Sequence, residues 1–306
     1  MTEAAGVSTP LPAGCILERH KPGEEVLSSS YPYREVVGSL NYLVTWVRPD
    51  LAFAVTQLAR HQENPTLRHR NAVKHCLRSL KATRNIGLTY SVTPNTAINE
   101  VVRAVNSNVV HMTRLHGFVD ASWAEDIDTR HSQSGYVFCY GNAAISWNSH
   151  LQHLVTLSST EAEYVALGDA VKEALYLCNL FCELLNTDIP PIALLEDNQN
   201  TIKQALSLQS TRRTKHIDIR HHFPKEHFAN SSFTLHYIPT QLQGADCLTK
   251  SLNRVKVAFF RINYNPCTYT TFSFLFLSFH SITKSAQHPI NQSSTFNNKN
   301  NNNNME

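Results

Sequence analysis

The chain has 306 residues, 42% of them hydrophobic, which is enough for one large domain or two small ones with a real core. Its formal net charge of +3 is only mildly basic, so charge alone says little about nucleic acid as a partner. Seven cysteines without a Cys-x-x-Cys pair favour reduced thiols inside a cell, cytoplasmic or nuclear, over a disulfide framework. The apolar run at 271–282 is too short and too interrupted to span a bilayer, so no membrane partner is expected.

The first third of the chain is predicted to be helical after an irregular start. Residues 1–30 contain scattered Pro, Gly and Ser without periodicity and are expected to form a linker or partial leader. Residues 31–92 carry three helix-period stripes separated by prolines, and Asp50 is placed to cap the second helix. These stripes predict a small helical segment. The weakly patterned residues 93–114 are expected to be a connector.

Residues 115–252 predict alternating strands and helices. Strand-like runs lie at 117–119, 135–140, 144–147, 154–157, 192–195 and 233–238. The pair Gly141-Asn142 predicts a hairpin turn between two of these strands. A long helix from Ser158 to about Leu185 follows the first four runs, three of which are counted as meandering strands, and strands and helices then alternate. This order predicts an α/β domain with a mixed sheet.

The end of the chain has a different composition. Residues 262–306 are rich in Ser, Thr, Phe and Asn and close on an Asn-rich run. Without a periodicity that could pack, residues 253–306 are expected to be a disordered tail.

The start of the long helix contains two glutamates with different expected roles. Ser158 can serve as N-cap, and Glu161 can complete a capping box by reaching back to the N-cap amide. Glu163 points about 200° away from Glu161, onto a face that continues through Leu167 and Ala170. Because that face is apolar, Glu163 is expected to be a buried carboxylate that needs a cation or a donor. The alternative is a place at the rim, where Glu163 reaches water.

Acidic residues stand at the ends of four predicted elements. Asp120 ends the first strand, Glu163 begins the long helix, Asp197 ends the fourth strand, and Asp246 lies in the last helix. Singly, each can be a turn residue, a helix cap or a solvated side chain. Because such element ends gather at one edge of a mixed sheet, together they predict a site for divalent cations. Two Mg²⁺ ions about 4 Å apart can activate water and stabilise the leaving oxygen of a phosphodiester.

Several motifs in this region occur in a recognisable order. They are Gly117-Phe118-Val119-Asp120, Ser134-Gly135-Tyr136, Ile145-Ser146-Trp147, Ser158-Ser159-Thr160-Glu161-Ala162-Glu163, Asp197-Asn198-Gln199, Thr214-Lys215-His216-Ile217 and Ala245-Asp246-Cys247-Leu248. In this order they resemble the ribonuclease H (RNase H) domain of Ty1/copia-type retrotransposon polyproteins. The segment 33–52 is similar to the stretch that follows the polymerase in the same polyproteins.

The resemblance implies both a fold and an activity. The implied fold is an RNase H-like mixed five-stranded sheet flanked by helices and preceded by a small helical connection segment. The implied activity is endonucleolytic hydrolysis of the RNA strand of RNA–DNA hybrids, with two Mg²⁺ ions, or Mn²⁺ in their place. The implied catalytic and metal-binding residues are Asp120, Glu163, Asp197 and Asp246, and the helix-face argument also favours Glu163 over Glu161. The implied partners are the hybrid and the polymerase portion of the same polyprotein.

Basic residues near 212–222 are candidates for contacts with nucleic acid. Arg212, Arg213 and Lys215 suit binding to backbone phosphates, and a solvated charged face is an equally good interpretation. His216 and His221 are five residues apart, off one helix face, and lie among cations that would repel a metal ion. Packing and phosphate contact are therefore favoured over a metal cluster there.

Some family features are missing or altered. The chain has no Asp-Asp pair, so the Tyr-x-Asp-Asp signature of a polymerase is absent and no reverse transcriptase activity is expected. Glu125 stands where Gly is usual, which strains a turn with positive φ, and His150 stands where Lys is usual. Pro224 is expected to interrupt a helix, at a cost of about 3 kcal/mol if it is interior. These departures define the alternative function: a catalytically silent fragment of a decayed retroelement that binds nucleic acid or a partner.

Overall fold

The computed structural model describes residues 4–90, 115–207, 218–229 and 233–264. All of them belong to one compact unit, Met1–Tyr269, while the second unit, Thr270–Glu306, lies outside the described residues. The expected connector at 93–114 also lies outside them. None of the helices in the described ranges is both long and apolar enough to cross a membrane.

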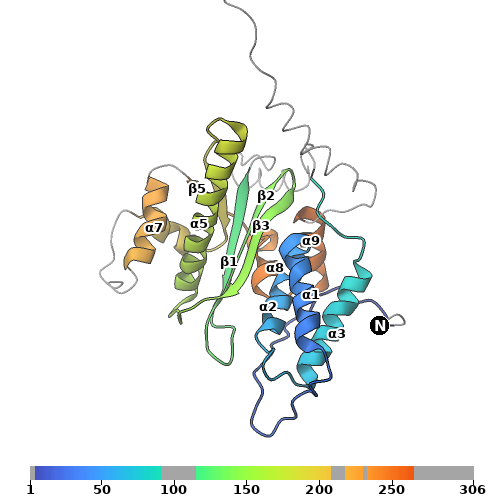
Figure 1. Cartoon of the computed structure of the whole chain (residues 1–306). Helices are drawn as coiled ribbons and strands as arrows, with labels where there is room; N and C mark the ends of the chain where they lie inside the picture. Colours follow the sequence, from blue (N-terminus) through green and yellow to red (C-terminus); the bar gives the residue numbers. More distant parts are fainter. Residues whose placement is uncertain (1–3, 91–114, 208–217, 230–232, 265–306) are drawn as a thin grey trace, which may run out of the picture. The chain divides into compact units, whose positions relative to one another are not determined.

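A five-stranded sheet forms the centre of the unit (Figure 1). Its strands are β1 (His116–Ser122), β2 (Gln133–Tyr140), β3 (Ala143–Leu151), β4 (Ile192–Glu196) and β5 (Phe233–Tyr237), in the order β3-β2-β1-β4-β5. The β1–β2 and β2–β3 pairs are antiparallel, whereas β1–β4 and β4–β5 are parallel. The expected mixed sheet is therefore confirmed. Gly141 and Asn142 join β2 to β3 with positive φ values of 58° and 64°, as a two-residue hairpin turn requires.

One predicted strand, at 154–157, is wrong. These residues form a loop that leads from β3 to the long helix. The Thr156 carbonyl accepts from the Trp123 indole at 3.0 Å, and the Thr156 hydroxyl lies 2.8 Å from that of Ser132. Leu157 is 85% exposed, and its N–H donates to the Glu161 carboxylate. These hydrogen bonds join Thr156 and Leu157 to side chains, and residues 154–157 pair with no strand of the described sheet.

Helices cover one face of the sheet. They are α5 (Ser159–Leu185), α6 (Gln199–Leu206) and α7 (Asp218–Ala229), and α5 buries Leu167, Ala170 and Ala174 in a core with Val119 and Leu194. The expected interruption at Pro224 is wrong, because α7 runs through this residue. Pro224 lies beside Gly168 of α5, where an added Cβ would be in ordinary van der Waals contact with Pro224 Cγ at 3.8 Å.

Segments from both ends of the described chain share a core with the other face. They are α1 (Tyr33–Trp46), η1 (Pro49–Leu51), α2 (Ala52–Ala59), α3 (Leu67–Ala82), η2 (Thr240–Leu242), α8 (Asp246–Thr249) and α9 (Arg254–Tyr264). The three helices predicted within 31–92 are thus confirmed. Their core includes Leu40 and Leu58 of the helices with Phe118 and Val137 of the sheet. Because Phe118 and Val119 alternate along β1, this core lies on the face opposite α5.

Three sequence-based expectations in these segments need correction. Leu11 and Leu17 are buried in the same core, so this part of the expected linker is packed. Part of the expected disordered tail is the helix α9, which buries Phe260. Asp50 caps no helix, because its carboxylate accepts hydrogen bonds from the guanidinium groups of Arg48 and Arg261, at 2.8 Å each.

Candidate metal centre

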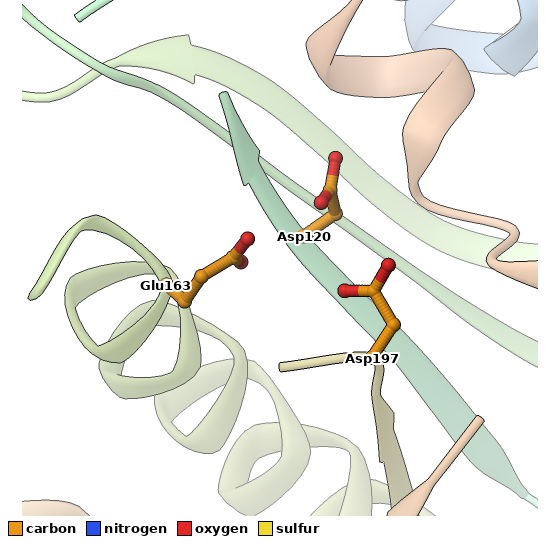
Figure 2. A group of neighbouring side chains, drawn as sticks. All are labelled: Asp120, Glu163 and Asp197. Atoms are coloured by element: carbon orange, nitrogen blue, oxygen red, sulfur yellow. The ribbon is translucent and has the colours of Figure 1, made fainter. Parts of the chain in front are cut away.

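Three of the four predicted acidic residues meet at one end of the sheet. Asp120 lies in β1, Glu163 lies in the first turns of α5, and Asp197 directly follows β4. Each offers a carboxylate oxygen, and the three oxygens lie within 4.8 Å of one another. Figure 2 shows the three carboxylates turned toward a common point. This acidic triad, Asp120–Glu163–Asp197, is the candidate metal centre.

Strand register brings Asp120 and Asp197 to the same level of the sheet. Phe118 pairs with Leu195 in the parallel β1–β4 ladder. Two residues further along each strand come Asp120 and Asp197, so the two aspartates stand side by side at the end of this ladder. Both aspartates therefore lie just beyond the last residues paired between β1 and β4.

The helix cap fixes the position of Glu163. The Ser158 hydroxyl accepts the Glu161 N–H at 3.1 Å, as predicted. The Glu161 carboxylate accepts the Leu157 N–H at 2.8 Å, one residue before the expected N-cap amide. Glu163 is only 7% exposed and lies on the same face as the buried Leu167. The predicted burial of Glu163 is therefore confirmed, and the rim alternative is wrong.

The triad is electrostatically unfavourable without a cation. Burial, and then the nearby Glu196, Asp120 and Asp197 carboxylates, raise the pKa of Glu163 well above its usual range. Glu163 Oε2 has no hydrogen-bond partner within the described part of the chain. Burial also raises the pKa of Asp120, although the Lys250 ammonium opposes this shift. A divalent cation would supply the charge that these oxygens lack.

The fourth predicted acid, Asp246, lies next to the triad and is held by two lysines. It is 1% exposed, and its Oδ1 accepts from Lys250 Nζ at 2.7 Å while its other oxygen accepts from Lys256 Nζ. Lys250 Nζ also lies 3.0 Å from Asp120 Oδ2, so this lysine bridges Asp246 to the triad. Burial lowers the pKa of Lys250, but Asp120 and Asp246 more than offset that effect and raise it overall.

Glu196 is an acidic residue of the site that sequence reasoning missed. It ends β4, is 0% exposed, and its Oε1 accepts the Asn198 N–H at 2.9 Å. Its Oε2 has no partner among the described residues, and burial raises the pKa of Glu196 well above its usual range. The alternation of Ile192, Leu194 and Glu196 along one face of the strand is the signal that could have found it.

The other singled-out residues have varied outcomes. The nucleic-acid-binding candidates Arg212, Arg213 and Lys215, and His216 with them, lie outside the described residues, as does the side chain of His221. Strain at Glu125 is not found, because the positive φ of that turn, 49°, belongs to the preceding Ala124. His150 Nε2 lies 3.3 Å from Asp169 Oδ2 on α5.

Comparison with known proteins gives relatives of one kind over most of the chain. It is 35% identical over 260 residues to the retrovirus-related Pol polyprotein from transposon TNT 1-94 of Nicotiana tabacum, covering 84% of this chain and 18% of that protein. It is 34% identical over 256 residues to the corresponding polyprotein from transposon RE2 of Arabidopsis thaliana, covering 83% of this chain and 16% of that protein. Secreted RxLR effector protein 161 of Plasmopara viticola is 40% identical over 146 residues, covering 48% of this chain and 91% of that protein.

Solved structures with similar folds include RNases H. RNase H1 from Halobacterium salinarum is 18% identical and aligns with a TM-score of 0.34, covering 44% of this chain and 94% of that one. LC11-RNase H1 in complex with an RNA/DNA hybrid is 11% identical, with a TM-score of 0.35 and coverage of 44% and 94%. No family model matches the chain. Over about 84% of its length, the chain is therefore related in sequence to retrovirus-related Pol polyproteins from Ty1/copia-type transposons.

Proposed function

We propose that the chain is a metal-dependent endonuclease of the RNase H type, which hydrolyses the RNA strand of RNA–DNA hybrids. The observation that carries this proposal is the acidic triad, whose three carboxylate oxygens lie within 4.8 Å of one another. Sequence similarity to the Pol polyproteins supports it, because the site motifs fall within the matched region. The chain spans only 18% and 16% of the length of two of these relatives.

The residues present fit a hard divalent cation. All three donors are carboxylate oxygens, the ligand type that Mg²⁺ and Mn²⁺ prefer. Buried Glu163 Oε2 has no hydrogen-bond partner among the described residues, so this oxygen is available as a ligand for a cation. Asp120 and Glu163 are buried, whereas Asp197 is partly exposed, so the centre opens toward solvent on the Asp197 side. Two bound Mg²⁺ ions, or Mn²⁺ in their place, would supply a nucleophilic water and charge stabilisation for the leaving oxygen.

The protein's own residues hold this arrangement rigid. Thr249 donates its hydroxyl hydrogen bond to Asp120, which fixes that carboxylate against α8. Asn198 accepts the N–H groups of Asn200 and Thr201, which starts α6 and fixes the turn that carries Asp197. Apolar residues of α5, including Leu167, exclude water behind Glu163. We further propose that Arg212, Arg213 and Lys215 contact phosphates of an RNA–DNA hybrid, and that the polymerase portion of the polyprotein is a second partner.

The test is cleavage of a labelled RNA–DNA hybrid by wild type and by Asp197→Asn. Because Asp197 is partly exposed, the variant should fold while losing one donor oxygen. We expect Mg²⁺-dependent cleavage by wild type and a loss of at least about a hundredfold in the variant. Asp188→Asn, the same change at an exposed position after α5, is the matched control and should cleave like wild type.

The alternative function, a catalytically silent fragment, gives a different result. It predicts hybrid binding without turnover, so that wild type and Asp197→Asn are equally inert. A thermal melt adds a second readout: a cation that binds only the folded protein must raise its Tm. A Tm that Mg²⁺ does not change, together with absent cleavage, would overturn the proposed function.

A further inference from the structure

A lysine side chain lies between two of the predicted metal-binding acids. Lys250 directly follows α8, and its Nζ is 3.2 Å and 3.0 Å from the two carboxylate oxygens of Asp120. The same nitrogen is 2.7 Å from Oδ1 of Asp246, one helical turn earlier in the chain. Both aspartates are 1% exposed, so their charges have little access to water. The ammonium group is therefore their neutralising partner.

This contact divides the four acids into two groups. Asp120 faces Glu163 and Asp197 in the triad and also faces Lys250. Asp246 lies outside the triad, and both of its oxygens accept from lysines, Lys250 and Lys256. An ammonium has a compact charge with three donors, so it occupies lone pairs that a divalent cation on the same oxygens would need.

We propose that Lys250 is a tethered counter-cation that competes with a divalent cation for Asp120 and Asp246. This rests on the proposed function and deepens it. The triad takes a first ion with Lys250 in place. A second ion, on the Asp246 side of Asp120, binds only when the lysine leaves.

Of the groups in this contact, the lysine is the one free to move. Asp120 is held within β1 and by the Thr249 hydroxyl, and Asp246 is buried in α8. The Lys250 side chain is 35% exposed and can swing into solvent without disturbing the core. Lys256 on α9 is 34% exposed and contacts Asp246 but is not paired with Asp120, so it neutralises the vacated aspartate in part. The second ion therefore displaces an ammonium instead of entering an open site.

The experiment counts Mn²⁺ ions bound to the full chain by electron paramagnetic resonance of the free ion. Wild type should bind one Mn²⁺ tightly and a second one weakly. Lys250→Met and Lys250→Gln should both bind the second ion at least about tenfold more tightly. Lys250→Arg keeps the positive charge and should behave like wild type. The matched control is Lys172→Met, which removes an exposed lysine from an i,i+3 pair with Asp169 on α5.

The outcomes separate this inference from the proposed function. If both neutral variants bind the second ion no more tightly than wild type, the competition is overturned, and the nuclease proposal stands wherever hybrid cleavage is seen. If folded wild type binds no Mn²⁺ and cleaves no hybrid, the proposed function fails and the inference fails with it. Glutamine retains hydrogen bonding at this position, so Lys250→Gln provides the measurement if Lys250→Met does not fold.

Discussion

Glu163 and Glu196 are two buried carboxylates whose second oxygens have no partner in the described part of the chain. Glu163 belongs to the triad, and its pKa is raised first by burial and then by the nearby Glu196 carboxylate. Glu196 accepts a hydrogen bond from the Asn198 N–H, and no cation of the described residues is in direct contact with it. An ionised carboxylate in such surroundings is costly, so each group either takes a proton or needs a positive ion nearby.

This gives a pH-dependent prediction for Glu196→Gln in the metal-free protein. The folded pKa of Glu196 is raised above its unfolded value, so the stability that this group contributes is present below the ordinary glutamate pKa, about 4.3, and is lost as pH rises through the folded pKa. Glutamine has no proton to lose. We therefore expect Glu196→Gln to be more stable than wild type at pH 9, by about 1–3 kcal/mol, and to lose that advantage at pH 5.

Urea unfolding at the two pH values measures this difference. The control is Glu183→Gln, which makes the same change at an exposed position of α5. It should change the free energy of unfolding by less than about 0.5 kcal/mol at either pH. A Glu196→Gln advantage that is equal at pH 5 and pH 9 would show that the carboxylate is not what destabilises the site.

The site residues differ in how far the sequence could predict them. Asp120, Glu163 and Asp197 lie near the ends of elements that the sequence pattern predicts, and the structure brings all three together. Lys250 could not be found in this way, because its role depends on α8 packing against β1. That contact joins positions 130 residues apart in the chain, and no local pattern encodes it.

At the scale of elements, α9 shows how a buried ion network replaces an expected helix cap. The carboxylate of Asp50 in η1 is fully buried. It forms ion pairs with Arg48 from the same turn and with Arg261 from α9. Arg261 also donates to the Ser8 carbonyl and to the Ser79 hydroxyl of α3. Four separate segments of the chain therefore meet at one guanidinium group. The two guanidinium groups together outweigh the effect of burial and lower the pKa of Asp50.

We predict that Arg261→Met strongly destabilises the protein. The substitution keeps much of the apolar stem but leaves the buried Asp50 with one cation in place of two, and such losses cost about 3–5 kcal/mol. Arg254→Met, at an exposed position of the same helix, is the matched control and should change stability by less than about 0.5 kcal/mol. Denaturant unfolding of both variants measures the difference. Equal stability of the two would mean that α9 is not anchored through this network.

Elements with strong local signals were predictable. The helices α1, α2, α3 and α5 follow apolar stripes, and the hairpin between β2 and β3 follows Gly141-Asn142. The strand prediction at 154–157 was wrong because an extended loop and a strand can share the same β-branched, apolar composition. Only pairing with a distant strand distinguishes the two. The helix α9 was not predicted for a related reason. Its buried face packs in a core with helices from the start of the chain, and a local pattern does not show that contact.

At the scale of the whole described unit, the N-terminal helices and the sheet are one folding body. The Trp147 indole on β3 donates to the Val44 carbonyl of α1 at 2.9 Å. Thr56 of α2 donates to the Ser149 carbonyl of β3 at 3.0 Å. Phe118, fully buried on β1, belongs to the same core as the helices. The sequence predicted a small helical segment but not its packing against the sheet, because periodicity shows that a helix has an apolar face but not what covers it.

A fragment that begins at residue 115 tests this continuity. Without residues 4–90, one face of the sheet loses the helices that cover Phe118, Val137 and Trp147, and burying each large apolar side chain is worth about 1.5–3 kcal/mol. For these three side chains the loss sums to about 4.5–9 kcal/mol, which is comparable with the 5–15 kcal/mol that usually separates a folded domain from its unfolded state. We expect the fragment to show no cooperative urea transition and to bind a hydrophobic dye, whereas the full chain unfolds in one step. Adding residues 4–90 as a separate polypeptide should restore the transition. A fragment that unfolds cooperatively by itself, at the same midpoint as the full chain, would instead make the helices a separate domain.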